Sequence, residues 1–332
     1  MKAQVIKTFG DPSVFQIEEI TKPTVKPGYV LIKVVATSMN PVDAYIRQGG
    51  ESHAAPALPA VLHGDVAGIV EEVGEGVTDF KHGDEVYGCP GGFKGTGGGA
   101  LAEYMLADQR LIAHKPKNLT MEEAAVLPLV TLTAWEALFD RGNIKKGQDV
   151  LIHAATGGVG HVAIQLAKWA GANVYTTAST EKKLTIATQL GADVGINYKQ
   201  ETVEEYVKKY TNGKGFDLVF DTVGGDNLDL SFEAAAINGT VVSILTYSKH
   251  DLSKMHMKGL SLHVTYMLLK IVNEDQRHRH GEMLNEITKI VEAEQLKPLI
   301  DTNVFTFDQV GEAHKFLESN KAIGKILIKN NW

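Results

Sequence analysis

A short apolar run, a glycine-rich turn and a run of helical period follow one another in this chain, and no other stretch constrains its fold as much. The apolar run is 149–152 and the helical run is 161–170. Between them lies a G-x-G-x-x-G pattern with alanine in the first glycine slot: Ala155, Thr156, Gly157, Gly158, Val159 and Gly160. Small residues let such a turn close and let the backbone approach a pyrophosphate at the positive end of the helix. We therefore expect a dinucleotide site here, rather than a glycine turn in an ordinary strand–helix unit.

Strands and helices alternate in this part of the chain. The pattern predicts strands at 149–154, 173–178, 193–197, 216–221, 239–245 and about 260–266, and helices at 160–170, 181–190, 202–210 and 226–236. Such alternation indicates a doubly wound α/β domain with a parallel six-stranded sheet. The last strand, within 261–267, alternates apolar and polar residues, and we expect it at the edge of the sheet.

The N-terminal part has a different texture. From Met1 to about Asn118, short β-branched runs are separated by proline and glycine turns, which predicts a compact β-barrel-like domain. A capping box at 120–123 opens a helix. An amphipathic helix at 282–296, a helix near 309–318 and a strand at 325–328 close the chain.

Composition narrows the class of protein. A chain of 332 residues with 44% apolar residues holds about two packed domains. Its net charge of −7, without a long basic block, argues against nucleic acid as a partner. No apolar run has transmembrane length, and the N-terminus lacks the apolar core of a signal peptide. We expect a soluble cytoplasmic enzyme.

The end of the second strand favours NADPH over NADH. In NAD sites a carboxylate at this place binds the ribose 2′-hydroxyl, but here the strand ends in small and hydroxyl residues at 176–180. Ser179 and Thr180 can donate hydrogen bonds to a 2′-phosphate, and Lys183 supplies positive charge. Lys183 is alternatively a solvated helix lysine. Tyr198, after the third strand, is expected over the adenine end.

Several motifs occur in an order that resembles a known family. They lie at 40–47, 64–68, 132–135, 154–160, 191–193, 197–198 and 324–326. With them the chain resembles the medium-chain dehydrogenase/reductase superfamily, in its zinc-free quinone oxidoreductase branch, which includes zeta-crystallin-like proteins. The resemblance implies a GroES-like β-barrel catalytic domain at 1–123 and 268–332, with a Rossmann NADP-binding domain at 124–267 inserted between its two parts.

The resemblance also implies site residues. Tyr45 and Asn40 match positions that line the nicotinamide cleft of the family, and Thr133 matches a position at the nicotinamide end. The expected cofactor contacts further include Val223, Ile244 and Leu245, near the ends of the fourth and fifth predicted strands. The alternatives are a turn role for Asn40 before Pro41, plain packing for Tyr45, and helix packing for Thr133.

The residue types exclude the zinc sites of related alcohol dehydrogenases. The first catalytic Cys position falls near Met39 and Asn40, the His-Glu slot holds Gly64 and Asp65, and the second Cys slot falls at about Leu129. The stretch 89–100 replaces the four-cysteine lobe, and a single cysteine, Cys89, builds neither site. We expect no metal, a packed or backbone-bonded His63, and a buried, unreactive Cys89.

Without zinc to hold an alkoxide, hydride transfer to an already activated electrophile is the expected chemistry. Quinones and α,β-unsaturated carbonyl compounds qualify, with Tyr45 and Asn40 as hydrogen-bond donors where negative charge develops. The alternatives are an NADPH-dependent enoyl, 2-haloacrylate or alkenal reductase that is inactive on quinones, and a non-catalytic NADPH-binding protein of crystallin type. The apolar edge strand and the resemblance favour a homodimer.

Several histidines outside these motifs are predicted to have structural rather than catalytic roles. The run 277–280, Arg-His-Arg-His, suits either a metal or phosphate patch or a solvated face before the amphipathic helix, and we predict the solvated face. His153, at the end of the first strand, is expected in the core, and His161 on the surface of the following helix.

Overall fold

The chain, in a computed structural model that describes residues 1–50 and 53–332, forms two compact units. The barrel unit comprises Met1–Leu132, Met267–Glu294 and Pro298–Trp332, and the sheet unit comprises Thr133–Tyr266 and Gln295–Lys297. The domain bounds expected from the sequence, 1–123, 124–267 and 268–332, stay a prediction beside these divisions.

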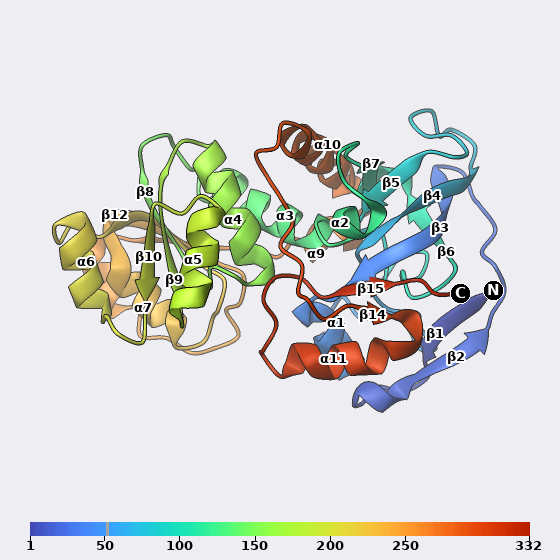
Figure 1. Ribbon diagram of the computed structural model, residues 1–332, viewed down its shortest axis with the longest axis horizontal. Coiled ribbons are helices and arrows are strands. Elements are labelled where there is room, and N and C mark those ends of the chain that lie inside the picture. The colour runs from blue at the N-terminus through green and yellow to red at the C-terminus, as the bar shows by residue number, and fades with distance from the viewer. Residues whose placement is uncertain (51–52) are drawn as a thin grey trace. The chain divides into compact units, whose positions relative to one another are not determined.

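The sheet unit contains a six-stranded parallel sheet with the order β10-β9-β8-β11-β12-β13 (Figure 1). Its strands are β8 (Asp149–Ile152), β9 (Asn173–Ala178), β10 (Val194–Asn197), β11 (Phe216–Asp221), β12 (Ala235–Ser243) and β13 (Ser261–Val264). The order reverses at β8, which creates the switch point where doubly wound sheets bind ligands. The predicted parallel sheet is thus confirmed, and so is the edge position of the last strand, which ends at Val264 because its partner β12 ends opposite at Ser243.

Four helices connect these strands close to their expected bounds. They are α4 (Gly158–Trp169), α5 (Glu181–Gln189), α6 (Val203–Thr211) and α7 (Asn227–Ala234), and the shorter α8 (Ser253–Lys258) precedes β13. A π-helical segment, Glu136–Arg141, follows α3 (Pro128–Trp135). Buried side chains from strands and helices, among them Leu151, Val219 and Phe232, form one apolar cluster.

The barrel unit is built on a seven-stranded sheet with the order β14-β15-β3-β4-β5-β7, in which β6 also pairs with β3 (Figure 1). These strands are β3 (Tyr29–Ser38), β4 (Val66–Val73), β5 (Glu85–Gly88), β6 (Tyr104–Asp108), β7 (Ile112–His114), β14 (Phe305–Thr306) and β15 (Leu327–Lys329), and β1 (Lys2–Ile6) pairs with β2 (Phe15–Glu19). Because β15 pairs with β3, the C-terminal strand completes the N-terminal domain, as the resemblance implies.

Several helices belong to the barrel unit. They are α1 (Pro41–Arg47), α2 (Met121–Ala125), α9 (Leu268–Val272), α10 (His278–Glu292) and α11 (Val310–Glu318), while α3 (Pro128–Trp135) crosses into the sheet unit. The predicted capping box is confirmed: Glu123 N donates to Thr120 Oγ1 at 3.2 Å, and Thr120 N donates to the Glu123 carboxylate at 2.9 Å. Helix α10 ends at Glu292 rather than 296, because Glu294 adopts a left-handed φ of +58°.

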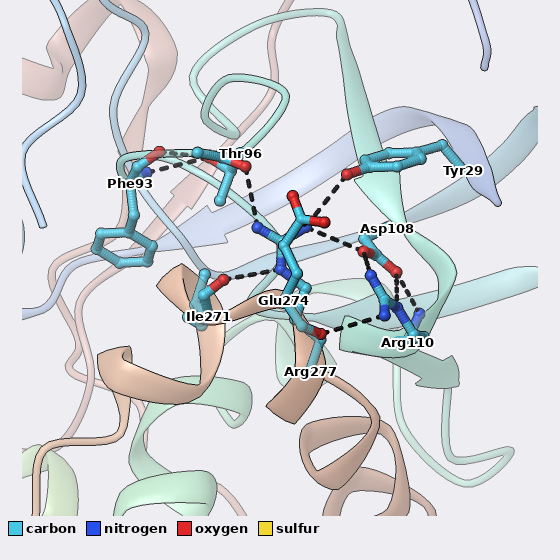
Figure 2. A network of polar contacts seen from close by, with 9 residues as sticks. Tyr29, Phe93, Thr96, Asp108, Arg110, Ile271, Glu274 and Arg277 are labelled. Carbon is cyan, nitrogen blue, oxygen red and sulfur yellow. Dashed lines mark hydrogen bonds and ion pairs between the residues drawn. The ribbon is translucent and has the colours of Figure 1, made fainter. Parts of the chain in front are cut away.

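The prediction that 277–280 is a solvated face is wrong for two of the four residues. Arg277 and His280 are each only 1% exposed, while His278 and Arg279 face solvent. Figure 2 shows the Arg277 guanidinium among its partners: Asp108 Oδ2 at 3.0 Å, Tyr29 Oη at 3.1 Å and the Ile271 carbonyl at 2.8 Å. Positions three apart share a helix face, so one inward face takes both buried side chains.

His161 is also misplaced by the sequence analysis. It is fully buried, with its Nδ1 3.1 Å from the Gly157 carbonyl oxygen, because α4 turns this face toward the interior of the sheet unit. His153 is buried as expected, and its Nδ1 lies 3.0 Å from Thr177 Oγ1. Within the described ranges, no helix is long and apolar enough to cross a membrane.

Candidate cofactor-binding and active-site residues

The glycine turn between β8 and α4 has the geometry of a phosphate cradle. Ala154 takes a left-handed φ of +57°, and Gly157 N donates to its carbonyl at 2.9 Å, which closes the turn. A Cβ on Gly160 would lie 2.1 Å from that same carbonyl oxygen, so only glycine lets α4 pack this closely. Gly157 caps the helix without a side chain, which leaves the first amides of α4 to an external acceptor. The predicted fingerprint residues, 155–160, therefore fit a pyrophosphate.

The end of β9 presents donors without a free carboxylate. Ser179 is half-buried and Thr180 caps α5, with its Oγ1 accepting from Lys183 N at 3.3 Å. Because the Thr180 oxygen accepts that bond, its hydrogen stays available as a donor. The nearest acid, Glu181, accepts a hydrogen bond from Asn197 Nδ2 at 3.1 Å. Lys183 is half-buried on the first turn of the helix.

Strand register brings Tyr198 to the same edge of the sheet. Asn197 of β10 pairs with Ala178 of β9, so the residues that follow them, Tyr198 and Ser179, leave neighbouring strand ends. Tyr198 N donates to the Ala178 carbonyl at 3.3 Å, and its side chain is 55% exposed. An exposed ring at this edge is a suitable platform for a planar base.

A buried carboxylate that the sequence analysis missed shapes the neighbouring loops. Asp221, the last residue of β11, accepts from the backbone amides of Val223 at 2.9 Å and Gly224 at 3.0 Å. Ile244 N donates to the Asp221 carbonyl, and Leu245 N donates to Ser243 Oγ at 3.2 Å. The predicted contacts Val223, Ile244 and Leu245 thus all lie at the carboxyl edge of the parallel sheet. The sequence did contain a signal for the role of Asp221: it is an acidic residue at the end of a predicted strand, shortly before the glycine pair 224–225.

Thr133 is the remaining predicted cofactor contact. It lies in α3, at the first position of the sheet unit, and is 5% exposed.

In the barrel unit, Tyr45 and Asn40 occupy different environments. Tyr45 is on the outer face of α1 and 46% exposed, whereas Asn40 precedes the helix and is 1% exposed. The Asn40 amide is already paired: Nδ2 donates to Asp65 Oδ2 at 2.8 Å, and Oδ1 accepts from Lys325 Nζ. The two predicted donors are therefore on one short segment, but only Tyr45 presents its side chain at the surface.

Asp65 and Lys325 form a buried ion pair, with their charged atoms 3.4 Å apart. Besides Asn40, Asp65 accepts from Ser38 Oγ at 2.7 Å and from Leu129 N at 2.8 Å. Burial lowers the pKa of Lys325, against the opposing charge of Asp65. Burial also raises the pKa of Asp43 to about 7, and the neighbouring charge of Asp65 adds to this effect. The sequence analysis assigned no role to Lys325. Its position next to an apolar predicted strand was a signal that this lysine is buried and paired with an acid.

The His63 prediction is confirmed as to packing, but its partner is a side chain. His63 is fully buried with φ +73°, and its Nε2 lies 3.1 Å from His314 Nε2. Arg47 Nε donates to His314 Nδ1 at 3.1 Å, so His314 donates onward through its Nε2. Burial lowers the pKa of His63 to about 3, and it lowers that of His314 as well. Both rings are therefore neutral at physiological pH.

The positions that correspond to zinc ligands in alcohol dehydrogenases hold packed, hydrogen-bonded side chains. Cys89 is buried as expected, and burial raises the pKa of its thiol. Across residues 1–50 and 53–332, no group of three or more His, Cys, Asp or Glu side chains is arranged to hold a metal ion.

Comparison with known proteins shows which family models match two segments of the chain. The family model "alcohol dehydrogenase GroES-like domain" matches residues 26–117, and the model "zinc-binding dehydrogenase" matches residues 158–287. An Arabidopsis thaliana protein named NADPH-dependent alkenal/one oxidoreductase, chloroplastic, is 36% identical over 99% of this chain and 79% of its own length.

Solved structures match this chain over nearly its full length, as two of them illustrate. An alcohol dehydrogenase superfamily protein from Novosphingobium aromaticivorans is 39% identical, with a TM-score of 0.93 and 99% coverage of both chains. Escherichia coli quinone oxidoreductase, crystallised with NADPH, is 28% identical, with a TM-score of 0.86, 99% coverage of this chain and 100% of its own. With the glycine turn, the barrel completed by its C-terminal strand and these end-to-end matches, the chain belongs to the medium-chain dehydrogenase/reductase superfamily, in its quinone oxidoreductase branch.

Proposed function

We propose that this protein is a zinc-independent, NADPH-dependent reductase that acts on quinones or α,β-unsaturated carbonyl compounds. The observation that carries the proposal is the carboxyl edge of the sheet unit. There, a glycine cradle stands beside a strand end at which hydroxyl groups and Lys183 replace the carboxylate of an NAD site. The names of the Arabidopsis and Escherichia coli relatives, both of which include NADPH, support the same cofactor.

Residues of the sheet unit hold the cofactor in this proposal. The first amides of α4 bind the pyrophosphate, Ser179, Thr180 and Lys183 bind the 2′-phosphate, and Tyr198 covers the adenine. Thr133, Val223, Ile244 and Leu245 contact the nicotinamide half. When bound, NADPH supplies the hydride for reduction of the acceptor.

Tyr45 assists the acceptor in this proposal. Its exposed hydroxyl donates a hydrogen bond to the acceptor oxygen, where negative charge develops as hydride reaches carbon. The sequence pairs Asn40 with Tyr45 in this role. Because the Asn40 amide is buried and paired with Asp65 and Lys325, we assign it to holding the segment before α1.

A zinc-independent reaction is supported by what surrounds Asp65. Three donors and the Lys325 ammonium already satisfy its carboxylate, so the position that corresponds to the His-Glu slot is neutralised by a built-in cation. Activity is expected to survive prolonged chelation, with well under one zinc per chain by elemental analysis. Stoichiometric zinc whose removal abolishes turnover would contradict this part of the proposal.

A narrower specificity has its own support. The Arabidopsis relative, at 36% identity, is named for alkenals and enones rather than quinones. An enoyl or alkenal reductase that ignores quinones is therefore the second candidate.

A panel of acceptors tests these assignments. Simple quinones, 2-alkenals, cyclic enones, an enoyl thioester and a 2-haloacrylate are each mixed with enzyme and either NADPH or NADH, and oxidation of the reduced nicotinamide is followed. Turnover of quinones and enones with NADPH supports the broad proposal, and turnover of enones alone supports the second candidate. Tight NADPH binding without turnover of any acceptor would instead favour a non-catalytic, crystallin-type role.

A homodimer and a cytoplasmic location complete the proposal. β13 lies at the sheet edge, with Val264 47% exposed, and two-fold pairing of such edges joins the sheets of two subunits. A monomer by light scattering at micromolar concentration would refute the dimer, and fractionation of cells would test the location.

A further inference from the structure

Helix α1 is short, yet it carries the side chain to which we assign the acceptor contact. It spans seven residues, Pro41–Arg47, and a helix of this length is not stable in water by itself. Catalytic groups must also be held closely, since a misplacement of about 1 Å can cost a hundredfold in rate. The position of Tyr45 therefore depends on what fixes the two ends of α1.

The N-terminal end is fixed by the buried Asp65–Lys325 pair. Lys325 Nζ donates to the Met39 carbonyl at 2.8 Å and to Asn40 Oδ1. Asp65 holds the same segment from its other side through Ser38 Oγ and Asn40 Nδ2. Both charged side chains are at most 2% exposed. The ammonium of Lys325 and the carboxylate of Asp65 thus both form hydrogen bonds with the residues that directly precede α1.

The C-terminal end is fixed by Arg47, whose side chain is fully buried. Its guanidinium donates to His314 Nδ1 at 3.1 Å, to the Gly10 carbonyl and to the Glu318 carboxylate. His314 and Glu318 both belong to α11, and His314 contacts His63 in turn. The last turn of α1 is therefore tied to α11 and to the loop at Gly10.

We propose that Lys325 and Arg47 are positioning residues that act through Tyr45. Together they fix both ends of α1, so that the Tyr45 hydroxyl meets the acceptor oxygen in one orientation. This inference rests on the role proposed above for Tyr45. It assigns the two cations no contact with the acceptor or with NADPH.

A double-mutant cycle tests the inference. Turnover of an enone is measured for the wild type, Lys325→Met, Tyr45→Phe and the double variant, at saturating NADPH. We expect Lys325→Met to lower kcat about tenfold or more, and to leave the Kd for NADPH within about twofold. In the Tyr45→Phe background the same change should cost less than about twofold, because the group that Lys325 positions is already gone. Equal fold losses in both backgrounds would overturn the proposal.

A second cycle keeps the test decisive if Lys325→Met does not fold. Glu318→Gln weakens the opposite end of α1 at a side chain that is 33% exposed, and Glu312→Gln on the same helix α11 is the matched control. We expect Glu318→Gln to lower kcat only when Tyr45 is present, and Glu312→Gln to change nothing. If Tyr45→Phe alone keeps full turnover, the proposed donor is wrong and the positioning role falls with it. If Tyr45→Phe is impaired but the losses multiply, only the positioning role fails.

Discussion

Arg277 offers a sharp test of how the barrel unit is held together. Its guanidinium is 1% exposed and forms an ion pair with Asp108, which is 3% exposed, at 3.0 Å. It also donates to the Gly95 carbonyl at 2.9 Å and to the Ile271 carbonyl at 2.8 Å (Figure 2). Arg277→Met removes the cation but keeps most of the apolar stem. Breaking a buried pair from one side costs about 3–5 kcal/mol. Because Arg110 still pairs with Asp108 at 2.7 Å, we expect a loss toward the lower end of this range.

Urea unfolding measures this loss, and Arg279→Met is the matched control two residues away. Arg279 pairs with Glu282 at the surface, with both side chains more than 40% exposed, and such pairs contribute about 0–1 kcal/mol. Replacing Trp135 and Trp169 by Phe leaves Trp332, which packs on Phe307, as the fluorescence reporter of the barrel unit. A loss below about 1 kcal/mol for Arg277→Met, or equal losses for the two variants, would refute a stabilising role of the buried Arg277–Asp108 pair.

Three further predictions follow from the cradle, the strand end and the buried histidines. Gly160→Ala should abolish NADPH binding in a titration calorimeter or destabilise the sheet unit in urea, because its Cβ would lie 2.1 Å from a backbone oxygen; wild-type binding and stability would contradict the cradle. Lys183→Ala should lower the affinity for NADPH by about tenfold, because it removes a charge-assisted hydrogen bond of roughly 1.5–3 kcal/mol, and should leave the affinity for NADH unchanged. An unchanged ratio of the NADPH and NADH affinities would show that Lys183 does not bind the 2′-phosphate. Burial lowers the pKa of His280 to about 3, so its share of stability is present above about pH 6.5 and is lost as the pH falls toward 3. His280→Phe should therefore reduce the acid slope of the unfolding free energy by about 1.4 kcal/mol per pH unit, as urea titrations at pH 6 and 5 would measure, and an unchanged slope would contradict the assignment.

Most secondary-structure elements of the fold could be predicted from local sequence patterns. The alternation of apolar strands and capped helices predicted the strands, the helices and the glycine turn, because each of these depends on residues close in sequence. The parallel sheet followed from that alternation, since a helical crossover lets two successive strands run in the same direction. The bounds of α4 to α7 agree with expectation to within two residues. The ends of β13 and α10 depended instead on a partner strand and on a left-handed residue, which no hydrophobic period reveals.

Buried polar groups were the part that the sequence did not reveal. Arg277 pairs with Asp108, which is 169 positions away in the sequence, and Lys325 pairs with Asp65, which is 260 positions away. A charged residue taken alone predicts a solvated surface, and only a partner brought in by tertiary structure makes its burial possible. Asn40 is a similar case: its residue type suits a hydrogen-bond donor to the acceptor, but Asp65 and Lys325 already bind both ends of its amide.

Isotope transfer tests whether this enzyme delivers hydride from NADPH to the carbon of its acceptor. The enzyme is supplied with NADPH that carries deuterium on one face of C4, then on the other, and an enone product is analysed by mass spectrometry and NMR. We expect one of the two labels to appear on the β-carbon, and the α-carbon to take its hydrogen from solvent, as a parallel reaction in D₂O would show. Turnover without transfer of either label to carbon, or no turnover of any enone or quinone, would contradict this hydride transfer.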